Sequence, residues 1–394
     1  MKVDCVGGGP ASLYFAVLMK RADPSHDITV YERYPEGSTY GWGVTYWDDL
    51  YNNLHSADPE SARAIGDDSV RWDTWVARVH GYRPPCLVES WDVGFGISRS
   101  RLLAILADRA RSLGVRIEYE REITSEEELT GADLIVAGDG INSALRQRHA
   151  GHLGTEVAVG RNAYLWLGTT KVFDSFIFAF IETPHGWIWF YGYRYSNEHS
   201  TCIIECLPET WAALGFDQAN EADSLALLEK LFADILDGHP LIGQDNAGES
   251  ARWLNFRTLT NERWHYGNLV LIGDAAHTTH YSVGAGTALA FGDAACLVYA
   301  LHAKPQLEPA LEFYERERQA EIRPMQKAAR NSARWYESLP RYANLPSEQL
   351  LALLAQRHSA LLPYVPPRLY YRFNQALKHA AWLWSKIASR GTPG

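Results

Sequence analysis

The sequence begins with Val3-Asp4-Cys5-Val6-Gly7-Gly8-Gly9-Pro10-Ala11-Ser12, a strand-like run that ends in a glycine turn. An apolar helical run, residues 13–19, follows the turn. A second strand-like run, residues 28–31, ends at Glu32-Arg33. Strand, glycine turn, helix, strand and acidic residue in this order form the βαβ unit that binds dinucleotides.

Each position of this turn has a physical role in holding a dinucleotide. Gly7 permits the tight turn, and Gly9 lets a pyrophosphate approach the backbone where the helix N-terminus favours negative charge. Ser12 replaces the third glycine of the fingerprint, but it is still small enough for close helix–strand packing. The expected cofactor contacts here are Gly7, Gly9, Pro10, Ala11, Ser12, Glu32 and Arg33.

Two later strands end in similar turns. Residues 131–137 run into Gly138-Asp139-Gly140, and residues 267–272 run into Gly273-Asp274. Gly284-Ala285-Gly286-Thr287 then precedes an apolar helix over 288–301. Asp274 can accept a hydrogen bond from a ribityl hydroxyl, and the free amides around Gly286 and Thr287 can face an anionic flavin edge.

The three motifs in this order resemble the group A flavoprotein monooxygenases, the single-component aromatic hydroxylases. The resemblance covers residues 1 to about 340 and includes Arg99-Ser100-Arg101-Leu102. After Gly273-Asp274 the chain has His280-Tyr281-Ser282-Val283-Gly284, which is similar to the violacein-pathway tryptophan-derivative hydroxylases and the salicylyl- and aminobenzoyl-coenzyme A hydroxylases. Other shared stretches are Tyr40-Gly41-Trp42-Gly43-Val44, Gly160-Arg161-Asn162, Tyr193-Arg194-Tyr195-Ser196 and Trp335-Tyr336-Glu337.

The resemblance implies a cofactor and a reaction. FAD is held non-covalently by all three motifs, with Arg99 and Asp139 in the set and Asp139 also near the nicotinamide donor. NADH or NADPH acts as a transient co-substrate, since the sequence shows only one dinucleotide fingerprint. O₂ then forms a C4a-hydroperoxyflavin that hydroxylates an electron-rich aromatic ring. This chemistry needs no catalytic triad, so the catalytic residues stay unassigned.

The expected fold class is α/β, with a Rossmann-like FAD-binding domain, an inserted antiparallel-sheet substrate domain and a helical C-terminal tail. The expected boundaries are 1–150 for the first FAD-binding part, 151–260 for the sheet domain, 261–340 for the rest of the FAD-binding domain, and 341–394 for the tail. A charged helical region over 308–340 is expected to break at Pro324 and to expose its arginines to solvent. The last helix is expected over 369–387 and can contact the sheet or a partner chain, so a homodimer is possible.

Residues of the sheet domain are expected to contact the substrate. Trp187, Trp189 and Tyr191 alternate along one strand and should share a face, which can cover an aromatic pocket. Tyr46, Trp47, His280 and Tyr281 are further candidates, each weighed against plain packing. The His277-x-x-His280 spacing lacks a third ligand, so no metal site is expected.

Several functions remain open. An indole-derived or small aryl substrate is favoured over a coenzyme A- or carrier-bound aryl acid, because the sheet domain has few basic residues besides Arg161, Lys171 and Arg194. A flavin oxidase or halogenase is an alternative, although Trp187-Ile188-Trp189 matches only part of the halogenase signature. A non-enzymatic flavoprotein is the remaining alternative.

Composition limits the partners. The chain has 394 residues and a formal net charge of −10, whereas a non-specific nucleic-acid binder needs a basic surface. The five cysteines show no Cys-x-x-Cys spacing, which favours free thiols and a reducing cytoplasm. The apolar stretch 275–292 contains two histidines and several polar residues, so a membrane span is not expected.

Overall fold

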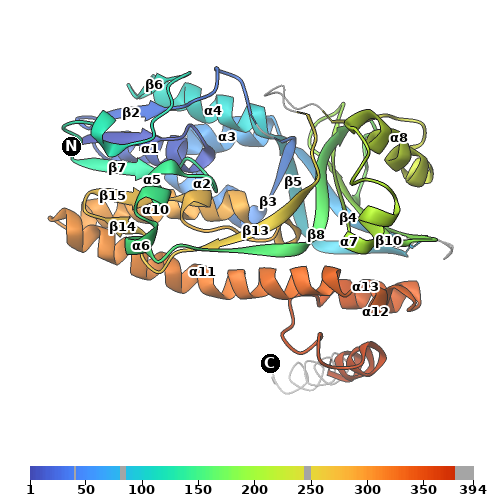
Figure 1. Cartoon of the computed structure of the whole chain (residues 1–394). Coiled ribbons are helices and arrows are strands. Elements are labelled where there is room, and N and C mark those ends of the chain that lie inside the picture. Colours follow the sequence, from blue (N-terminus) through green and yellow to red (C-terminus); the bar gives the residue numbers. More distant parts are fainter. Residues whose placement is uncertain (40, 80–85, 244–249, 378–394) are drawn as a thin grey trace, which may run out of the picture.

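A computed structural model describes residues 1–39, 41–79, 86–243 and 250–377 of the chain. Within these residues two sheets stand side by side, and a long helix runs beneath both of them (Figure 1). Tyr40 and residues 378–394, which include the end of the helix expected over 369–387, lie outside the described residues.

The first sheet contains the dinucleotide-binding unit. Its order is β14-β15-β7-β1-β2-β6, and β15, β7, β1, β2 and β6 run parallel. The bounds are β1 Lys2–Val6, β2 Asp27–Tyr31, β6 Arg116–Glu118, β7 Leu134–Ala137, β14 His265–Tyr266 and β15 Leu269–Leu271. The strands expected over 3–6, 28–31, 131–137 and 267–272 are therefore present.

The second sheet has the order β12-β8-β11-β10-β9-β4-β5-β3, with β13 beside β8. The bounds are β3 Gly43–Trp47, β4 Val70–Val79, β5 Cys86–Ser98, β8 Glu156–Thr169, β9 Phe176–Thr183, β10 Gly186–Arg194, β11 Ser200–Cys206, β12 Leu241–Ile242 and β13 Leu254–Thr260. It is antiparallel except where β4 runs parallel to β9. Strands β3 to β5 come from the 1–150 stretch, so this sheet draws on more of the chain than residues 151–260.

The helices surround the sheets (Figure 1). They are α1 Pro10–Ala22, α2 Asp48–Ala57, α3 Pro59–Asp67, α4 Arg99–Ser112, α5 Ala144–Arg148, α6 Ala150–Leu153, α7 Pro208–Ala213, α8 Glu221–Leu231, α9 Ala233–Leu236, α10 Gly286–Ala303, α11 Leu307–Glu337, α12 Pro340–Ala343 and α13 Ser347–Ala355, with 3₁₀ turns η1 Glu126–Glu128, η2 Gly273–Ala275 and η3 Tyr281–Val283. Residues 367–377 are also helical, which covers the described part of the expected last helix.

The predicted break in the charged helix was wrong. Helix α11 continues through Pro324. Pro324 is exposed, whereas Ile322 and Gln326 on either side are buried, so packing on the inner face holds the helix together where the proline removes a hydrogen bond. Nor are all its arginines exposed, because the guanidinium of Arg318 is buried against Asp293.

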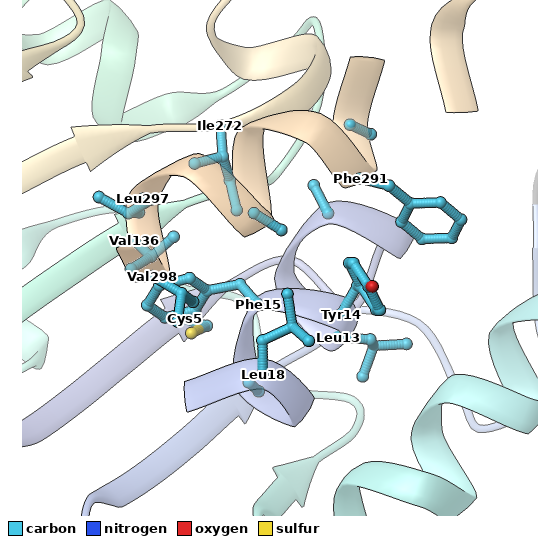
Figure 2. Packing of buried hydrophobic residues seen from close by; sticks show 14 of the residues in the cluster. Cys5, Leu13, Tyr14, Phe15, Leu18, Val136, Ile272, Phe291, Leu297 and Val298 are labelled. Atoms are coloured by element: carbon cyan, nitrogen blue, oxygen red, sulfur yellow. The ribbon is translucent and has the colours of Figure 1, made fainter. Parts of the chain in front are cut away.

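The hydrophobic core beside the first sheet forms where α1 packs against α10. Figure 2 shows Phe15 and Leu18 of α1 with Leu297 and Val298 of α10, next to Cys5 and Val136 from adjacent strands. The ring centroids of Tyr14 and Phe291 are 4.7 Å apart across the same contact. Helix α10 is long and apolar enough to span a membrane, but here it is a core helix in contact with α1 and α11.

Candidate functional site

The three glycine motifs meet at one edge of the first sheet. Strands β1, β7 and β15 are parallel neighbours, and Ala137 of β7 lies opposite both Val6 and Leu271. Each strand therefore ends beside the others, and the motif that follows each begins at the same edge. Ligands of open α/β sheets bind outside the carboxyl ends of the strands, which places a candidate site here.

Small residues let the motifs interlock. Gly7 has a φ of +94°, and a Cβ at this position would lie 2.6 Å from the carbonyl oxygen of Gly138. A Cβ on Gly138 would lie 2.2 Å from the hydroxyl of Ser12, and one on Gly273 would lie 3.0 Å from the Cβ of Ala11. Ser12 and Ala11 thus occupy positions where only small side chains fit, and they join α1 to the other two motifs.

Two helix N-termini point backbone amides at this edge. Helix α1 starts at Pro10 after Gly9, and α10 starts at Gly286 after Ala285, and neither preceding residue makes a side-chain capping bond. A Cβ on Gly286 would meet nothing within 4 Å. Gly286 and Asp274 are exposed although most residues from 269 to 285 are buried or half-buried. The N-terminus of α10 therefore has open space in front of it, as an anion-binding helix end requires.

Glu32 follows β2 and faces the first glycine turn. Its Oε2 accepts a 2.7 Å hydrogen bond from the Gly8 amide, and its Oε1 accepts a 2.9 Å bond from the Tyr34 amide. Each carboxylate oxygen keeps a lone pair for a further donor such as a ribose hydroxyl. Arg33 instead points outward, with its guanidinium 4.8 Å from the Tyr34 ring and 3.8 Å from Glu122.

We expect Glu32→Ala to weaken FAD binding ten- to a hundredfold, because a charge-assisted hydrogen bond contributes about 1.5–3 kcal/mol. Titration of the apoprotein with FAD, followed by flavin fluorescence, measures the affinity. Glu122→Ala is the matched control, since Glu122 is exposed and, within the part of the chain that the structure describes, forms its one ion pair with Arg33. Equal FAD affinity in the two variants would place the ribose elsewhere.

Asp139 offers one free carboxylate oxygen. Its Oδ2 accepts a 3.0 Å hydrogen bond from the Ala144 amide at the start of α5, whereas the buried Oδ1 has no hydrogen-bond partner among the described residues. Burial raises the pKa of Asp139. The buried Arg146 donates to the carbonyl of Ala275 at 3.2 Å, and so ties this turn to the third motif. An unpartnered buried oxygen at this edge fits a polar group of a bound ligand.

Asp274 lies where the third motif meets Arg99. Desolvation by the surrounding protein raises the pKa of the Asp274 carboxyl. The charges of His277 and Arg99 act in the opposite direction and lower the pKa by less. Arg99 is the first residue of α4, and its guanidinium donates to the Thr39 hydroxyl. The exposed side chain of Asp274 can therefore accept a hydrogen bond beside a cation, as expected for a contact with a hydroxylated chain.

A buried ion network supports this turn from behind. Asp293 of α10 accepts hydrogen bonds from the Gly273 amide at 2.8 Å, from His277 Nε2 at 2.8 Å and from Arg318 Nε at 2.9 Å. Neither Asp293 nor Arg318 was predicted from the sequence as a member of the site. The sequence did contain one signal for this network, because Asp293 is a single acid within the apolar helical run 288–301.

The second sheet supplies the aromatic side of the site. Trp187, Trp189 and Tyr191 lie in one buried cluster, whereas Ile188 and Phe190 lie in the cluster on the opposite face. The predicted alternation is thus confirmed. Trp189 stacks on Tyr336 of α11 with ring centroids 5.7 Å apart, so this end of the strand is covered. We call the cluster around Trp187, Trp189 and Tyr191 the aromatic face.

Tyr46 points away from the aromatic face. It is buried in the hydrophobic core beside the first sheet. Its ring stacks on Phe95 with centroids 5.0 Å apart, and its hydroxyl donates to Ser69 at 2.7 Å. Its neighbour Trp47 contacts the aromatic-face cluster, with its ring centroid 5.3 Å from that of Trp72. Successive strand residues face opposite sides, so of the two candidates Tyr46 and Trp47 only Trp47 contacts the cluster.

His277 and His280 have different partners. His277 binds Asp293, whereas Nδ1 of His280 lies 2.8 Å from the Ser282 hydroxyl. Tyr281 reaches the aromatic face, with its ring centroid 5.6 Å from that of Tyr191. Its hydroxyl donates to Glu205, a buried acid on β11 that the sequence analysis did not single out.

The residues present fit FAD. Three glycine motifs, two helix N-termini, and carboxylates at Glu32, Asp139 and Asp274 surround one sheet edge. Anionic phosphates match the helix N-termini, and hydroxyls match the carboxylates. The aromatic face contacts Tyr281, seven residues after Asp274, and so it adjoins the third motif.

Comparisons with known proteins agree with this geometry. A family model described as an FAD binding domain matches residues 89–329. A salicyloyl-CoA 5-hydroxylase from Streptomyces sp is 37% identical over 354 residues, which are 87% of this chain and 66% of that protein. A 3-hydroxy-4-methyl-anthranilyl-(aryl-carrier protein) 5-monooxygenase from Streptosporangium sibiricum is 34% identical, over 91% of this chain and 94% of that protein.

Two further similarities extend over most of the chain. A protodeoxyviolaceinate monooxygenase from Chromobacterium violaceum is 32% identical, over 96% of this chain and 100% of that protein. The solved tetrameric form of 2-methyl-3-hydroxypyridine-5-carboxylic acid oxygenase superposes with a TM-score of 0.67 at 20% identity, over 94% of this chain and 95% of that one. At that identity the superposition shows a shared fold.

Proposed function

The chain belongs to the FAD-binding domain family of flavoprotein aromatic monooxygenases, and we propose that it uses NADH or NADPH and O₂ to hydroxylate an electron-rich aromatic substrate. The resemblance found in the sequence is thereby confirmed. One observation carries the proposal: three cofactor motifs and an aromatic face meet at the third motif, around Asp274 and Tyr281.

The residues of the chain have distinct tasks in this reaction. Bound FAD, once reduced by a nicotinamide, supplies the oxygen-activating chemistry. The glycine turns and the helix N-termini hold the phosphates, and Asp274 holds the hydroxylated chain. The aromatic face and Trp47 exclude water and orient the ring of the substrate beside the flavin.

The preferred substrate is a small aryl or indole-derived acid. The aromatic face is lined by rings and supplies few charges, which suits a flat uncharged ring. Two of the three basic residues counted for the sheet domain are already engaged in ion pairs, since Arg161 pairs with Glu209 and Lys171 pairs with Asp237.

A thioester-bound aryl acid is the second candidate. Lys327, Arg330 and Arg334 lie on the exposed face of α11 and form no ion pair within the described residues. Ala333 and Glu337 of the same helix line a cavity near Glu205, so these cations lie close to the substrate side. Coenzyme A phosphates would match them. Two of the relatives named above act on coenzyme A- and carrier-bound aryl acids.

The test uses the purified full chain. Acid precipitation should release free FAD into the supernatant, and flavin in the pellet would contradict non-covalent binding. NADH and NADPH oxidation are then measured with indole-containing acids and with salicylyl and aminobenzoyl thioesters. Faster flavin reduction with free acids supports the first candidate, and acceleration by thioesters alone supports the second. No acceleration by any aromatic, with FAD bound, would contradict the proposed function.

We further propose that the protein forms a homodimer. Leu369, Phe373 and Leu377 are exposed and lie four residues apart on the helix over 367–377, so they form one apolar stripe. Light scattering of the holoenzyme measures the mass, and a monomer at micromolar concentration would contradict the dimer.

A further inference from the structure

A second cavity lies on the outer side of the second sheet. It has a volume of about 360 Å³, and Trp211 of α7, Phe216 and Trp253 supply aromatic walls. Cavities of about 300–1,000 Å³ that combine apolar and aromatic walls with a few polar groups are typical of small-molecule sites. The residues that line it are different from those placed above around FAD and on the aromatic face.

The second sheet separates this cavity from the aromatic face. Leu165 of β8 lines the cavity and belongs to the same buried cluster as Ile188 and Phe190. Its two neighbours on β8, Tyr164 and Trp166, contact the cluster of the aromatic face instead, because successive strand residues face opposite sides. Helix α8 lies on the outer side of the sheet (Figure 1). A ligand in the cavity would therefore lie across the sheet from the aromatic substrate.

Local hydrogen bonds hold the walls of the cavity in place. The amide of Phe216 donates to the Trp211 carbonyl at 3.2 Å, and the amide of Ala219 donates to the Gly215 carbonyl at 3.1 Å. The ring of Phe216 also contacts that of Trp253, with centroids 4.8 Å apart. These contacts join the turn between α7 and α8 to the segment before β13, so the walls are formed before a ligand arrives.

Two groups of opposite charge line the same cavity. Glu221, the first residue of α8, is half-buried, and its Oε1 accepts a 3.2 Å hydrogen bond from the Ala251 amide. A Cβ on Gly243 would lie 2.1 Å from this oxygen, so the glycine leaves room for the carboxylate. Within the described residues Glu221 Oε2 accepts no hydrogen bond, so a ligand can donate to it. Arg252 is exposed and lines the cavity, so its guanidinium can meet an anionic group on the solvent side.

We propose that this cavity binds a small aromatic zwitterion, with the chemistry of an aromatic amino acid. The ring packs between Trp211, Phe216 and Trp253, where an apolar flat group fills the space. The ammonium group donates to Glu221, and the carboxylate accepts from Arg252. Each charge thus gains a charge-assisted hydrogen bond, and a ligand that lacks either charge loses one. This site is additional to the proposed function and does not depend on it.

Calorimetric titration of the FAD-loaded full chain tests the choice of ligand. L-Phenylalanine and L-tryptophan are the probes, and at least one of them should bind with one equivalent per chain. 3-Phenylpropionate lacks the ammonium group and phenethylamine lacks the carboxylate, so each should bind at least tenfold more weakly than L-phenylalanine. Absence of binding by both amino acids at millimolar concentration, or equal affinity for the three phenyl ligands, would overturn the proposal.

Glu221→Gln tests the contact with the ammonium group. The glutamine carbonyl can still accept from the Ala251 amide, but the negative charge is lost. L-Phenylalanine should bind at least tenfold more weakly, whereas 3-phenylpropionate should bind as it does to the wild type. Asp223→Asn is the matched control, because it removes an exposed acid from the same turn of α8 that is not part of the cavity wall. Equal loss in the two variants, or no loss in Glu221→Gln, would overturn the role of Glu221.

A cavity-filling variant locates the ligand. Ala219 is half-buried in the wall, so Ala219→Trp should place an indole in the cavity and abolish binding of both amino acids. Ala213→Trp, the same change at an exposed alanine that ends α7, should leave binding unchanged. Bound FAD shows that each variant is folded. Retained amino-acid binding by FAD-loaded Ala219→Trp would place the ligand elsewhere and overturn the site. These readouts need no turnover, so failure of the proposed function would leave them unchanged.

Discussion

Gly7→Val is expected to lower FAD affinity more than a hundredfold and to destabilise the fold by about 3 kcal/mol or more. The position has a φ of +94°, which costs an L-residue roughly 1–2 kcal/mol and a β-branched residue more. The new Cβ would also lie 2.6 Å from the Gly138 carbonyl oxygen and 2.7 Å from Asp139 Cα. Both atoms belong to the backbone of the second motif, so relief of the clash must push the two cofactor turns apart.

Gly215→Val is the matched control for this variant. Gly215 has a φ of +79°, but a Cβ there would meet nothing within 4 Å, and it follows α7 on the second sheet's side. It carries the conformational cost without the clash between motifs. We expect a modest stability loss and unchanged FAD affinity, measured by urea unfolding and by FAD titration. Near-normal FAD affinity in Gly7→Val would contradict the placement of the cofactor.

Asp293→Ala is expected to destabilise the protein by about 3–5 kcal/mol, because removal of one member of a buried ion pair leaves its partner uncompensated. Asp293 is 0% exposed and accepts hydrogen bonds from Arg318, His277 and the Gly273 amide. The measurement is urea unfolding of the FAD-free protein. Glu317→Ala, which breaks an exposed pair with Arg316, should change stability by less than about 1 kcal/mol.

The pH dependence gives a second check on Asp293. Burial acts to raise its pKa, but its hydrogen-bond partners outweigh burial and lower the pKa below the usual value. An acid whose folded pKa is lowered stabilises the protein above its unfolded pKa, and that contribution is lost as pH falls through the folded pKa. Wild-type stability should therefore decline in acid more steeply than that of Asp293→Asn. Parallel acid profiles would mean that Asp293 is not ionised in the fold.

The cofactor side of the site was largely predictable from local sequence. Each motif is a strand, a turn and a helix start within about twenty residues, and glycine positions mark the turns. What the sequence could not supply was the adjacency of β1, β7 and β15, which depends on sheet order. The aromatic alternation at Trp187 and Trp189 was predictable for a similar reason, because strand periodicity is local.

The substrate side depended on long-range pairing and was less predictable. Tyr46 and Trp47 differ only in the face they present, and that face is decided by the pairing of β3 with β5. Glu205 meets Tyr281 across 76 residues, and Asp293 meets Arg318 across 25. In both cases a lone acid within an apolar run was visible in the sequence, but its partner was not.

The most direct test of the account is the origin of the oxygen atom in the product. FAD-loaded protein, a reduced nicotinamide and the most active aromatic of the panel are incubated under ¹⁸O₂, and the product is weighed by mass spectrometry. The account predicts one ¹⁸O atom on the aromatic ring for each nicotinamide oxidised in coupled turnover. A product labelled only from H₂¹⁸O, or nicotinamide oxidation that yields peroxide and an unchanged ring with every aromatic, would contradict it.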